Sequence, residues 1–453
     1  MNGSILFASP EHPGELNPLL SIVLELADRG HADLWVSSHE EARPRVEGKY
    51  PVGFLSAGPV HSEIDESVYS AMVRGPMTTA GMAALARRIM REEAAGAVYA
   101  ATLEHIDQVR PRLMVIDALS PGAFDAAIVR NIPYVVTIPY PASSFYQSRL
   151  PWRYPTPGSG LPSQVSGLQA WKNVSYRLRL QAAMLSAVDR RSVRRRKAAG
   201  IANVFGQPEK YAATARAVFA FSAFGIEYPF SAPDNLHMLG PMIPPVDPSG
   251  PEDELDRWLD AHPSVVYVCL GTMARLTTEQ LTTLAQALDR LGPKHHVLWK
   301  LPKDQQAQLP AGLGDHIRLE EWVPSQLGVL AHENVRAFVT HGGGNGLHEG
   351  IYFGKPLLVM PFWLDCYDFA ARAVDAGVGL ALDRPPHFTA DELVGKANRL
   401  LDEEDFAERS RYWGAQLRNA GGVGRAADLI LEMAGSEPLV GAGAQAAESG
   451  VPA

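Results

Sequence analysis

The sequence is poor in cysteine, with only Cys269 and Cys366 among 453 residues. The two lie far apart in the chain. Disulfide-stabilised secreted domains use many closely spaced cysteines, so this pattern excludes that class and fits a reduced compartment. We therefore predict a cytoplasmic protein without disulfide bonds.

Signals for export and membrane insertion are also missing. The first residues, MNGSILFASPEH, lack the charged region and the long apolar region of a signal peptide. No apolar run is long enough to span a bilayer. We expect no membrane span.

Basic charge is in deficit. The chain has 41 Lys and Arg against 50 Asp and Glu, which gives a net charge of −9. There is no basic tail, so the sequence argues against a nucleic-acid partner. It also has no internal repeat of solenoid period.

The length and the alternation of apolar runs with helical stretches predict two α/β domains with parallel sheets. A proline-rich passage follows Gly240-Pro241 and is read as a linker. The last residues are small and of low complexity, which predicts disorder. The predicted units are an N-terminal domain (1–238), a linker (239–252), a C-terminal domain whose last helix is a candidate to pack back on the first domain (253–434), and a disordered tail (435–453).

Three features are expected in the N-terminal half. A helix is predicted from Pro18 to Gly30, with Asn17 as its cap. An arginine-rich helix from Tyr176 to Gly200 is interpreted as a solvated face, with binding of an acidic ligand as the alternative. The proline-rich segment 139–164 is predicted either to offer aromatic side chains to a flat or apolar ligand or to pack them on the domain. These side chains are Phe145, Tyr146, Trp152 and Tyr154.

A glycine-rich segment, residues 342–346, lies between an apolar strand pattern ending at His341 and a helix predicted from Leu347 to Tyr352. Glycines let a ligand approach the backbone, and a helix N-terminus attracts phosphate. The dinucleotide fingerprint GxGxxG is not met, because Leu347 occupies the third glycine's place. Phosphate binding and an ordinary strand-to-helix turn both remain open on the glycines alone.

The residues around this segment resemble the donor-binding signature of family-1 glycosyltransferases, which include UDP-glycosyltransferases and antibiotic (macrolide) glycosyltransferases. The resemblance implies the GT-B fold, in which two Rossmann-like domains face each other across a cleft and the C-terminal one holds the sugar nucleotide. The residues that carry it are Trp322 to Gln326, Val329 to His332, Phe338 to Asn345, Glu349, Gly354 to Pro356, Pro361 and Asp365.

The resemblance also implies roles for single residues. Trp322 and Gln326 would face the uracil and ribose, although Gln326 aligns only if Ser325 is an insertion. Glu349 would accept hydrogen bonds from both ribose hydroxyls, which favours UDP over dTDP. No metal and no cofactor besides the UDP-sugar substrate are implied. The predicted donor-binding residues are Gly271, Thr272, Trp322, Val323, Gln326, His341, Gly343, Gly344, Asn345, Gly346, Glu349, Asp365 and Cys366.

This chain departs from the family at the catalytic base. The family's histidine, in a motif that here reads Gly14-Glu15-Leu16-Asn17-Pro18, is replaced by Glu15, while the supporting aspartate matches Asp117. Two close carboxylates repel, which raises one pKa and leaves Glu15 able to act as a general base. His12 is the substitute candidate, and a role for Glu15 as a helix-capping carboxylate is the alternative.

A second departure concerns the sugar. Many glucose-using relatives have Asp-Gln where this chain has Asp365-Cys366. Glucose remains the default donor sugar, with N-acetylglucosamine or another hexose open. The family's acceptor pocket would include the aromatic segment 139–164.

The sequence thus predicts an inverting UDP-sugar glycosyltransferase that acts by direct displacement on a small aromatic or apolar natural product. A monomer or a homodimer is expected. Two alternatives stay open: a sugar-nucleotide-binding protein that has lost transferase activity at Glu15, and a GT-B UDP-sugar epimerase, which needs no acceptor pocket.

Overall fold

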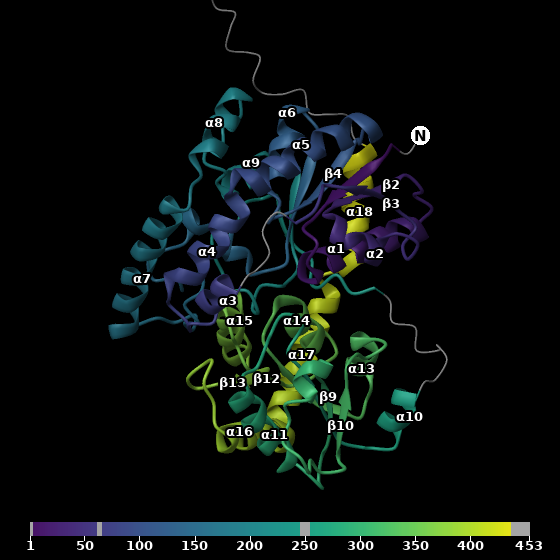
Figure 1. Ribbon diagram of the computed structural model, residues 1–453, viewed down its shortest axis with the longest axis vertical. Coiled ribbons are helices and arrows are strands. Elements are labelled where there is room, and N and C mark those ends of the chain that lie inside the picture. The colour runs from purple at the N-terminus through teal and green to yellow at the C-terminus, as the bar shows by residue number, and fades with distance from the viewer. Residues whose placement is uncertain (1–2, 61–65, 245–253, 436–453) are drawn as a thin grey trace, which may run out of the picture.

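The computed structural model describes residues 3–60, 66–244 and 254–435, which form two α/β domains one above the other (Figure 1). The first domain holds a seven-stranded parallel sheet in the order β3-β2-β1-β4-β5-β6-β7. Its strands are β1 (Ile5–Ala8), β2 (Leu34–Ser38), β3 (Gly53–Ser56), β4 (Leu113–Asp117), β5 (Tyr134–Ile138), β6 (Ala217–Ala220) and β7 (Leu236–Met238).

The second domain holds a six-stranded parallel sheet in the order β10-β9-β8-β11-β12-β13. The predicted architecture, two doubly wound Rossmann-like α/β domains with parallel sheets, is confirmed. Its strands are β8 (Val265–Cys269), β9 (His296–Lys300), β10 (Ile317–Glu320), β11 (Val335–Thr340), β12 (Leu357–Val359) and β13 (Gly379–Ala381).

Helices cover both faces of each sheet, and the described α-helices divide between the two domains. The first domain has α1 (Pro13–Asp28), α2 (Arg43–Val46), α3 (Glu66–Met72), α4 (Thr79–Met90), α5 (Glu92–Val109), α6 (Pro121–Val129), α7 (Gly167–Ser186), α8 (Arg190–Ala198) and α9 (Pro208–Thr214). The second domain has α10 (Glu254–Asp260), α11 (Thr278–Asp289), α12 (Lys303–Gln306), α13 (Gln326–Ala331), α14 (Gly344–Tyr352), α15 (Leu364–Asp375), α16 (Ala390–Asp402) and α17 (Glu404–Asn419). A last described helix, α18 (Gly422–Gly435), returns to the first domain.

The strand order fixes where ligands can bind. In each sheet the chain reverses its direction of winding beside the first strand, between β1 and β4 and between β8 and β11. Loops diverge from the carboxyl ends of strands at such a point and leave a crevice. Residues that follow β1, β5, β8 and β11 line one shared cavity, so the two crevices face each other.

Helix α18 belongs to the first domain although it ends the described chain. It packs against α1, and Val423, Ala427 and Ile430 share a buried apolar cluster with Leu16 and Leu19 (Figure 1). These side chains are almost inaccessible to solvent. The core of the first domain is therefore completed by the last described helix. Most of the predicted linker (245–252) and the predicted tail beyond Gly435 lie outside the described residues.

The first helix begins earlier than predicted. It starts at Pro13 rather than Pro18, and His12, not Asn17, occupies the N-cap position. A proline at the first helical position loses no helical hydrogen bond, which makes Pro13 a favourable start. The prediction placed the start at the second proline. The shift puts Glu15 on the first turn of α1 instead of in a preceding loop.

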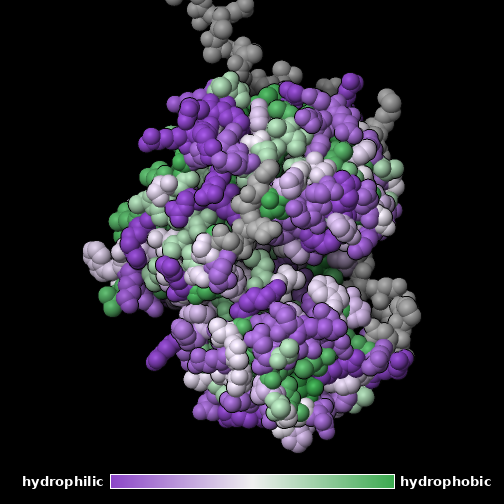
Figure 2. Space-filling view, in the orientation of Figure 1, coloured by the Kyte–Doolittle hydropathy of each residue, from purple (hydrophilic) through white to green (hydrophobic). Residues whose placement is uncertain are grey.

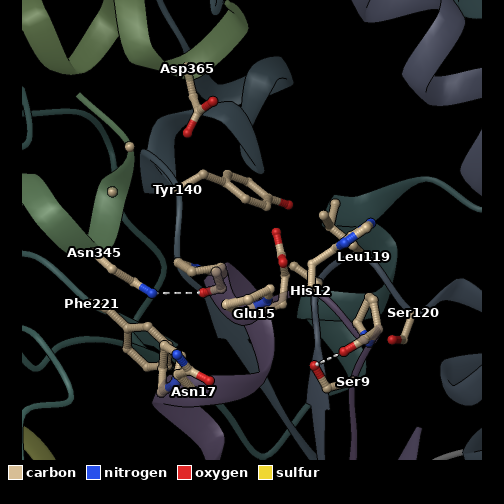
Figure 3. A pocket seen from close by; sticks show the side chains of 18 of the residues that line it. Ser9, His12, Glu15, Asn17, Leu119, Ser120, Tyr140, Phe221, Asn345 and Asp365 are labelled. Carbon is tan, nitrogen blue, oxygen red and sulfur yellow. Dashed lines mark hydrogen bonds between the residues drawn. The ribbon is translucent and has the colours of Figure 1, made fainter. Parts of the chain in front are cut away.

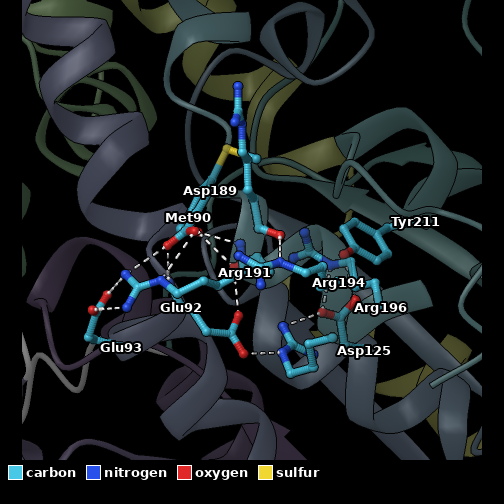
Figure 4. Close-up of polar contacts among 12 residues, drawn as sticks. Met90, Glu92, Glu93, Asp125, Asp189, Arg191, Arg194, Arg196 and Tyr211 are labelled. Atoms are coloured by element: carbon cyan, nitrogen blue, oxygen red, sulfur yellow. Dashed lines mark hydrogen bonds and ion pairs between the residues drawn. The ribbon is translucent and has the colours of Figure 1, made fainter. Parts of the chain in front are cut away.

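The predicted arginine-rich helix is two helices, α7 and α8, separated at residues 187–189. Much of the positive charge of α8 is paired within the domain, as Figure 4 shows. Arg195 and Arg196 both contact Asp125 Oδ2, at 3.0 and 2.8 Å, and the hydroxyl of Tyr211 donates to Asp125 Oδ1 at 2.7 Å. The interpretation of this stretch as a solvated face is wrong for Arg196, which is 1% exposed.

We expect Asp125→Ala to lower the free energy of unfolding by about 3–5 kcal/mol, because it leaves the buried Arg196 without its counter-charge. Asp391→Ala is the control, since it removes the exposed partner of Arg290. It should lower the free energy of unfolding by at most about 1 kcal/mol. Denaturant unfolding of the two variants measures both values. An equal decrease in the free energy of unfolding for both variants would show that burial of Asp125 with Arg195, Arg196 and Tyr211 does not add to stability.

No helix in the described part of the chain is both long and apolar enough to cross a membrane.

Candidate active site

The cleft between the two sheets forms one cavity with a volume of about 1960 Å³. Ordinary ligand pockets measure roughly 300–1,000 Å³, so this cavity has room for two ligands at once. Both domains contribute to its walls, through Glu15 and Tyr140 on one side and His341 and Asp365 on the other. The geometry is that of a site where two molecules meet.

The glycine-rich segment forms the start of α14 rather than a loop before it. Gly343 is the N-cap, and Gly344, Asn345 and Gly346 make the first turn. A Cβ at position 344 would come within 2.4 Å of the Pro139 carbonyl oxygen, so the close approach of the two domains requires glycine there. The N-terminal N–H groups of this helix favour an anion at the cavity wall.

His341 lies beside this helix start and next to Gly271, whose φ of +78° places it in the left-handed region. Burial lowers the pKa of His341 to about 4. Its Nδ1 atom has no hydrogen-bond partner in the described structure. The ring is therefore neutral at physiological pH, and a neutral imidazole can still donate one hydrogen bond to a phosphate oxygen.

We expect the imidazole NMR signals of His341 to titrate near pH 4 instead of the ordinary 6.5. The cause is loss of water around the ring, which penalises the charged form. A His341→Gln variant identifies the signals by their disappearance. Titration near neutrality would contradict a neutral His341.

The predicted nucleoside residues come together on one side of the second domain. Gln326 Nε2 donates to Glu349 Oε2 at 2.6 Å, and burial raises the pKa of Glu349. Ser325 caps α13 by accepting from the Gly328 N–H at 3.0 Å, which places Gln326 at the first position of the helix. Trp322 is 64% exposed, and Lys300 Nζ lies 3.5 Å from its ring centre.

Other predicted donor residues occupy the same cavity. Thr272 lines it directly after β8, and Asp365 does so from the first turn of α15. Burial and the neighbouring Asp368 raise the pKa of Asp365 to about 7. Val323 and Cys366 also contribute to the wall, but both are buried in the core of the second domain. Burial raises the pKa of the Cys366 thiol, so it remains a neutral thiol.

Of the two predicted acidic side chains, Glu15 lines the cavity, whereas Asp117 is fully buried at the end of β4 and takes no part in the cavity wall. Burial, and then the charge of Asp117, raise the pKa of Glu15 to about 8. Burial likewise raises the pKa of Asp117, which accepts the Leu119 N–H at 2.8 Å through Oδ1. Its Oδ2 atom has no hydrogen-bond partner. Figure 3 shows the Tyr140 ring between two groups. The side chains of Glu15 and His12 lie on one side of it, and the Asp365 carboxyl lies on the other.

A hydrogen bond across the cleft holds the two halves of the site in register. Asn345 Nδ2 donates to the carbonyl oxygen of Gly14 at 3.1 Å (Figure 3). In a regular helix the N–H of residue 18 would occupy that carbonyl, but Pro18 has no N–H. The proline thus frees the acceptor that Asn345 uses. No sequence pattern indicated this contact, and the role of Asn345 as a donor-binding residue stays a prediction.

His12 lies in a separate ionic cluster at the cavity wall. Its Nε2 atom is 3.2 Å from Glu11 Oε1, while Glu11 Oε2 is 2.7 Å from His39 Nδ1. Burial opposes ionisation of Glu11, but the His39 hydrogen bond and the charge of His12 outweigh it and lower its pKa to about 2. Burial lowers the pKa of His12, despite Glu11.

Sequence reasoning missed several residues of the cavity. Each of Glu11, Tyr140 and Lys300 stands at or just after the carboxyl end of a strand, where α/β proteins place their ligand contacts. Applying that rule to every predicted strand would have found them. Arg88 comes from a helix, and no sequence signal pointed to it.

The predicted aromatic acceptor surface is not brought together. Phe145 lines the cavity, but Tyr146, Trp152 and Tyr154 are not part of its wall. Tyr146 and Tyr154 are buried in apolar clusters, and Trp152 is 55% exposed on the outer surface. The alternative, packing on the domain, describes Tyr146 and Tyr154. The wall of the first domain contains the aromatic rings of Phe124, Phe205 and Tyr211, which come from elsewhere in the domain. It also contains aliphatic side chains from α4, from the end of α7 and from the segment that follows α7, namely Met82, Leu85, Ile89, Met184, Leu185 and Val188.

Comparison with known proteins is consistent with this geometry. The profile of a family described as UDP-glucoronosyl and UDP-glucosyl transferase matches residues 23–410. UDP-glucuronosyltransferase 2C1 of Oryctolagus cuniculus is 30% identical over 303 residues, which cover 62% of this chain and 56% of that protein. UDP-glycosyltransferase 71B6 of Arabidopsis thaliana is 32% identical over 172 residues, 34% of this chain and 35% of that protein. The matches thus span about a third to just over half of these curated relatives.

Solved structures share the fold across almost the whole chain. The glycotransferase of kitacinnamycin superimposes with a TM-score of 0.70 at 20% identity and covers 95% of this chain and 99% of its own. An anthocyanidin 3-O-glucosyltransferase solved in complex with UDP gives a TM-score of 0.65 at 18% identity, over 96% of this chain and all of its own. At this identity the likeness establishes the fold.

Proposed function

The chain belongs to the UDP-glucoronosyl and UDP-glucosyl transferase family, and we propose that it transfers a hexose from a UDP-sugar to a small apolar acceptor. Glucose is the default sugar. The observation that carries the proposal is the 3.1 Å hydrogen bond from Asn345 to the Gly14 carbonyl. It sets the first turn of α14, where an anion is favoured, against the turn of α1 that bears Glu15.

The second domain holds the donor in this proposal. Trp322 stacks on the uracil, and Glu349 accepts hydrogen bonds from the ribose hydroxyls, which a deoxyribose only half supplies. The pyrophosphate lies against the N–H groups of residues 343–346, Thr272 and the neutral His341. Asp365 binds sugar hydroxyls. Helix dipole and side chains stabilise the leaving group without a metal.

The first domain holds the acceptor. The aliphatic side chains of α4 and α7 line this half of the cavity and suit an apolar body. The polar end of the same space carries Glu15 and Tyr140, which suit a hydroxyl group. A pocket of this kind supports transfer over the epimerase alternative, which requires no acceptor.

The chemistry is a direct displacement. The Glu15 carboxylate takes the proton of the acceptor hydroxyl as that oxygen attacks the anomeric carbon from the face opposite UDP. The bond from that carbon to the phosphate oxygen breaks, its electron pair leaves with UDP, and the configuration inverts. Asp117 acts as a positioning residue whose charge keeps Glu15 basic.

The first test is to incubate the protein with pooled UDP-hexoses and a pool of phenols, macrolides and terpenoids, and to measure UDP release and product mass. The expected result is an acceptor heavier by one hexose, formed equally well with a chelator present. Conversion of UDP-sugar without acceptor would support the epimerase alternative. Tight UDP-sugar binding without any product would support the binding protein.

The cytoplasm remains the proposed location, in keeping with two buried free cysteines. A monomer or homodimer remains the proposed assembly, and sedimentation of the purified protein decides between them.

A further inference from the structure

Helix α7 (Gly167–Ser186) exposes a row of large apolar side chains. Leu168, Trp171, Leu178 and Leu185 are 70%, 76%, 53% and 75% exposed. Successive members of this row are three, seven and seven residues apart. Because seven residues make almost two helical turns, the four side chains lie along one side of the helix. The opposite side is buried against the domain, through Tyr176 and Leu180 among others. Monomeric proteins seldom expose such a contiguous apolar row without a partner.

Basic side chains border this row. Lys172 and Arg179 are exposed, and each follows an exposed apolar residue by one position, which places them in a parallel line about 100° further round the helix. Helix α7 contains no acidic residue. Residues 167–200 carry nine Lys and Arg against the single acid Asp189, in a chain whose net charge is −9. On α7 itself the exposed basic side chains are Lys172 and Arg179, while Arg191, Arg195 and Arg196 of α8 are paired with acidic side chains. The apolar row is therefore bordered by basic charge that no acidic residue of its own helix offsets.

The helix stands at the margin of the first domain (Figure 1), where Figure 2 shows apolar side chains beside hydrophilic ones. From Leu168 to Leu185 the row extends about 26 Å along the helix axis. A helix with Trp and Leu on one side and Lys and Arg beside them matches those that lie in the interface of an anionic bilayer. Tryptophan favours the interface between lipid and water because its ring is apolar while its N–H remains hydrated.

We propose that α7 docks the protein on the surface of a membrane that contains anionic lipids. A second copy of the chain is a poorer occupant, because a two-fold contact would bring two basic and acid-free faces together. The end of α7 also supplies Met184 and Leu185 to the cavity wall, so the docking face continues into the apolar half of the cleft. Membrane docking itself does not depend on the transferase proposal.

The test is flotation of the full chain with vesicles of phosphatidylcholine alone or of phosphatidylcholine with phosphatidylglycerol. Binding to the second kind, weakened by added salt, is expected. Lys172→Ala/Arg179→Ala should lower the partition coefficient about 30-fold, since each basic residue at such a surface contributes about fivefold. Trp171→Ser/Leu178→Ser should lower it at least about tenfold by removing inserted apolar area.

The matched control is Tyr412→Ser, which removes an aromatic ring of similar exposure (54%) on α17 of the second domain and should leave binding unchanged. Thermal melts of all variants verify that they fold. No flotation of the wild type, or equal flotation of all variants, overturns the proposal. It is also overturned if the wild type sediments as a dimer that Trp171→Ser/Leu178→Ser separates, or if it binds poly-glutamate but no vesicles, which points to an acidic protein.

Discussion

Replacing Glu15 by glutamine is expected to reduce kcat about 10³-fold, within the range that general-base catalysis contributes. The amide keeps the size of the side chain and its hydrogen bonds but cannot accept the acceptor's proton. Binding of UDP-sugar should stay within about twofold of the wild type, because the donor lies against the second domain. Product formation and donor affinity, measured on one preparation, separate the two effects.

The pH dependence gives an independent signature of the same group. Glu15 acts as a base only when ionised, and its pKa is raised to about 8. The kcat/KM should therefore rise with pH through about 8 and level off above it. Between pH 7 and pH 9 the increase is about tenfold for a group of this pKa. Asp117→Asn removes the neighbouring charge, so the midpoint should move to lower pH.

His12→Ala is the comparison variant, because His12 is the other candidate base. It is expected to retain most activity, since its imidazole is held in the cluster with Glu11, His39 and Arg88. Thermal melting of the His12→Ala and Glu15→Gln variants verifies that both are folded. Full activity in Glu15→Gln with activity lost in His12→Ala would assign the base to His12.

Replacing Glu349 by alanine is expected to raise KM for the UDP-sugar about 10- to 100-fold. The substitution removes the acceptor of the ribose hydroxyls, and a hydrogen bond to a charged group is worth about 1.5–3 kcal/mol. It also leaves Gln326, which now donates to Glu349 at 2.6 Å, without its partner. The preference for UDP-sugar over dTDP-sugar should largely disappear, because the contact that reads the 2′-hydroxyl is lost.

Glu349→Gln controls for the volume of the side chain, since it keeps one acceptor oxygen at the same place. It should lie between the wild type and the alanine variant in both affinity and nucleotide preference. Competition of UDP and dTDP against one bound donor measures both. An unchanged preference in Glu349→Ala would place ribose recognition elsewhere.

The parts of the site that follow a local pattern were predictable. The end of β11 and the helix after it come from one short stretch whose geometry is local, although that helix begins at Gly344 rather than Leu347. The hydrogen bond between Gln326 and Glu349 joins two helices, α13 and α14, and was not predicted. Glu15 and Asp117 were also identified, because each stands at a fixed place in a motif. The two sheets followed from the alternation of apolar runs, which reflects strands buried on both faces.

The parts that depend on packing between distant segments were not predictable. The sequence left Tyr146 and Tyr154 open between ligand contact and packing on the domain, and only the fold shows that neighbouring side chains bury them. Asn345 was predicted only as a donor-binding residue, and its amide hydrogen bond to Gly14, 331 residues away in the chain, was not foreseen. Arg196 read as solvated, and only the fold places Asp125 beside it. No local pattern encodes these contacts.

The position of α18 has a consequence for how the protein is made. A ribosome completes the first sheet and α1 long before it synthesises the helix that covers Leu16 and Leu19. The nascent first domain must carry that apolar surface uncovered through the synthesis of the whole second domain, which invites aggregation or chaperone binding. We expect nascent chains arrested before residue 420 to be cut in the first domain by protease, and full chains to resist it. The first domain therefore reaches its native state only after α18 has been synthesised.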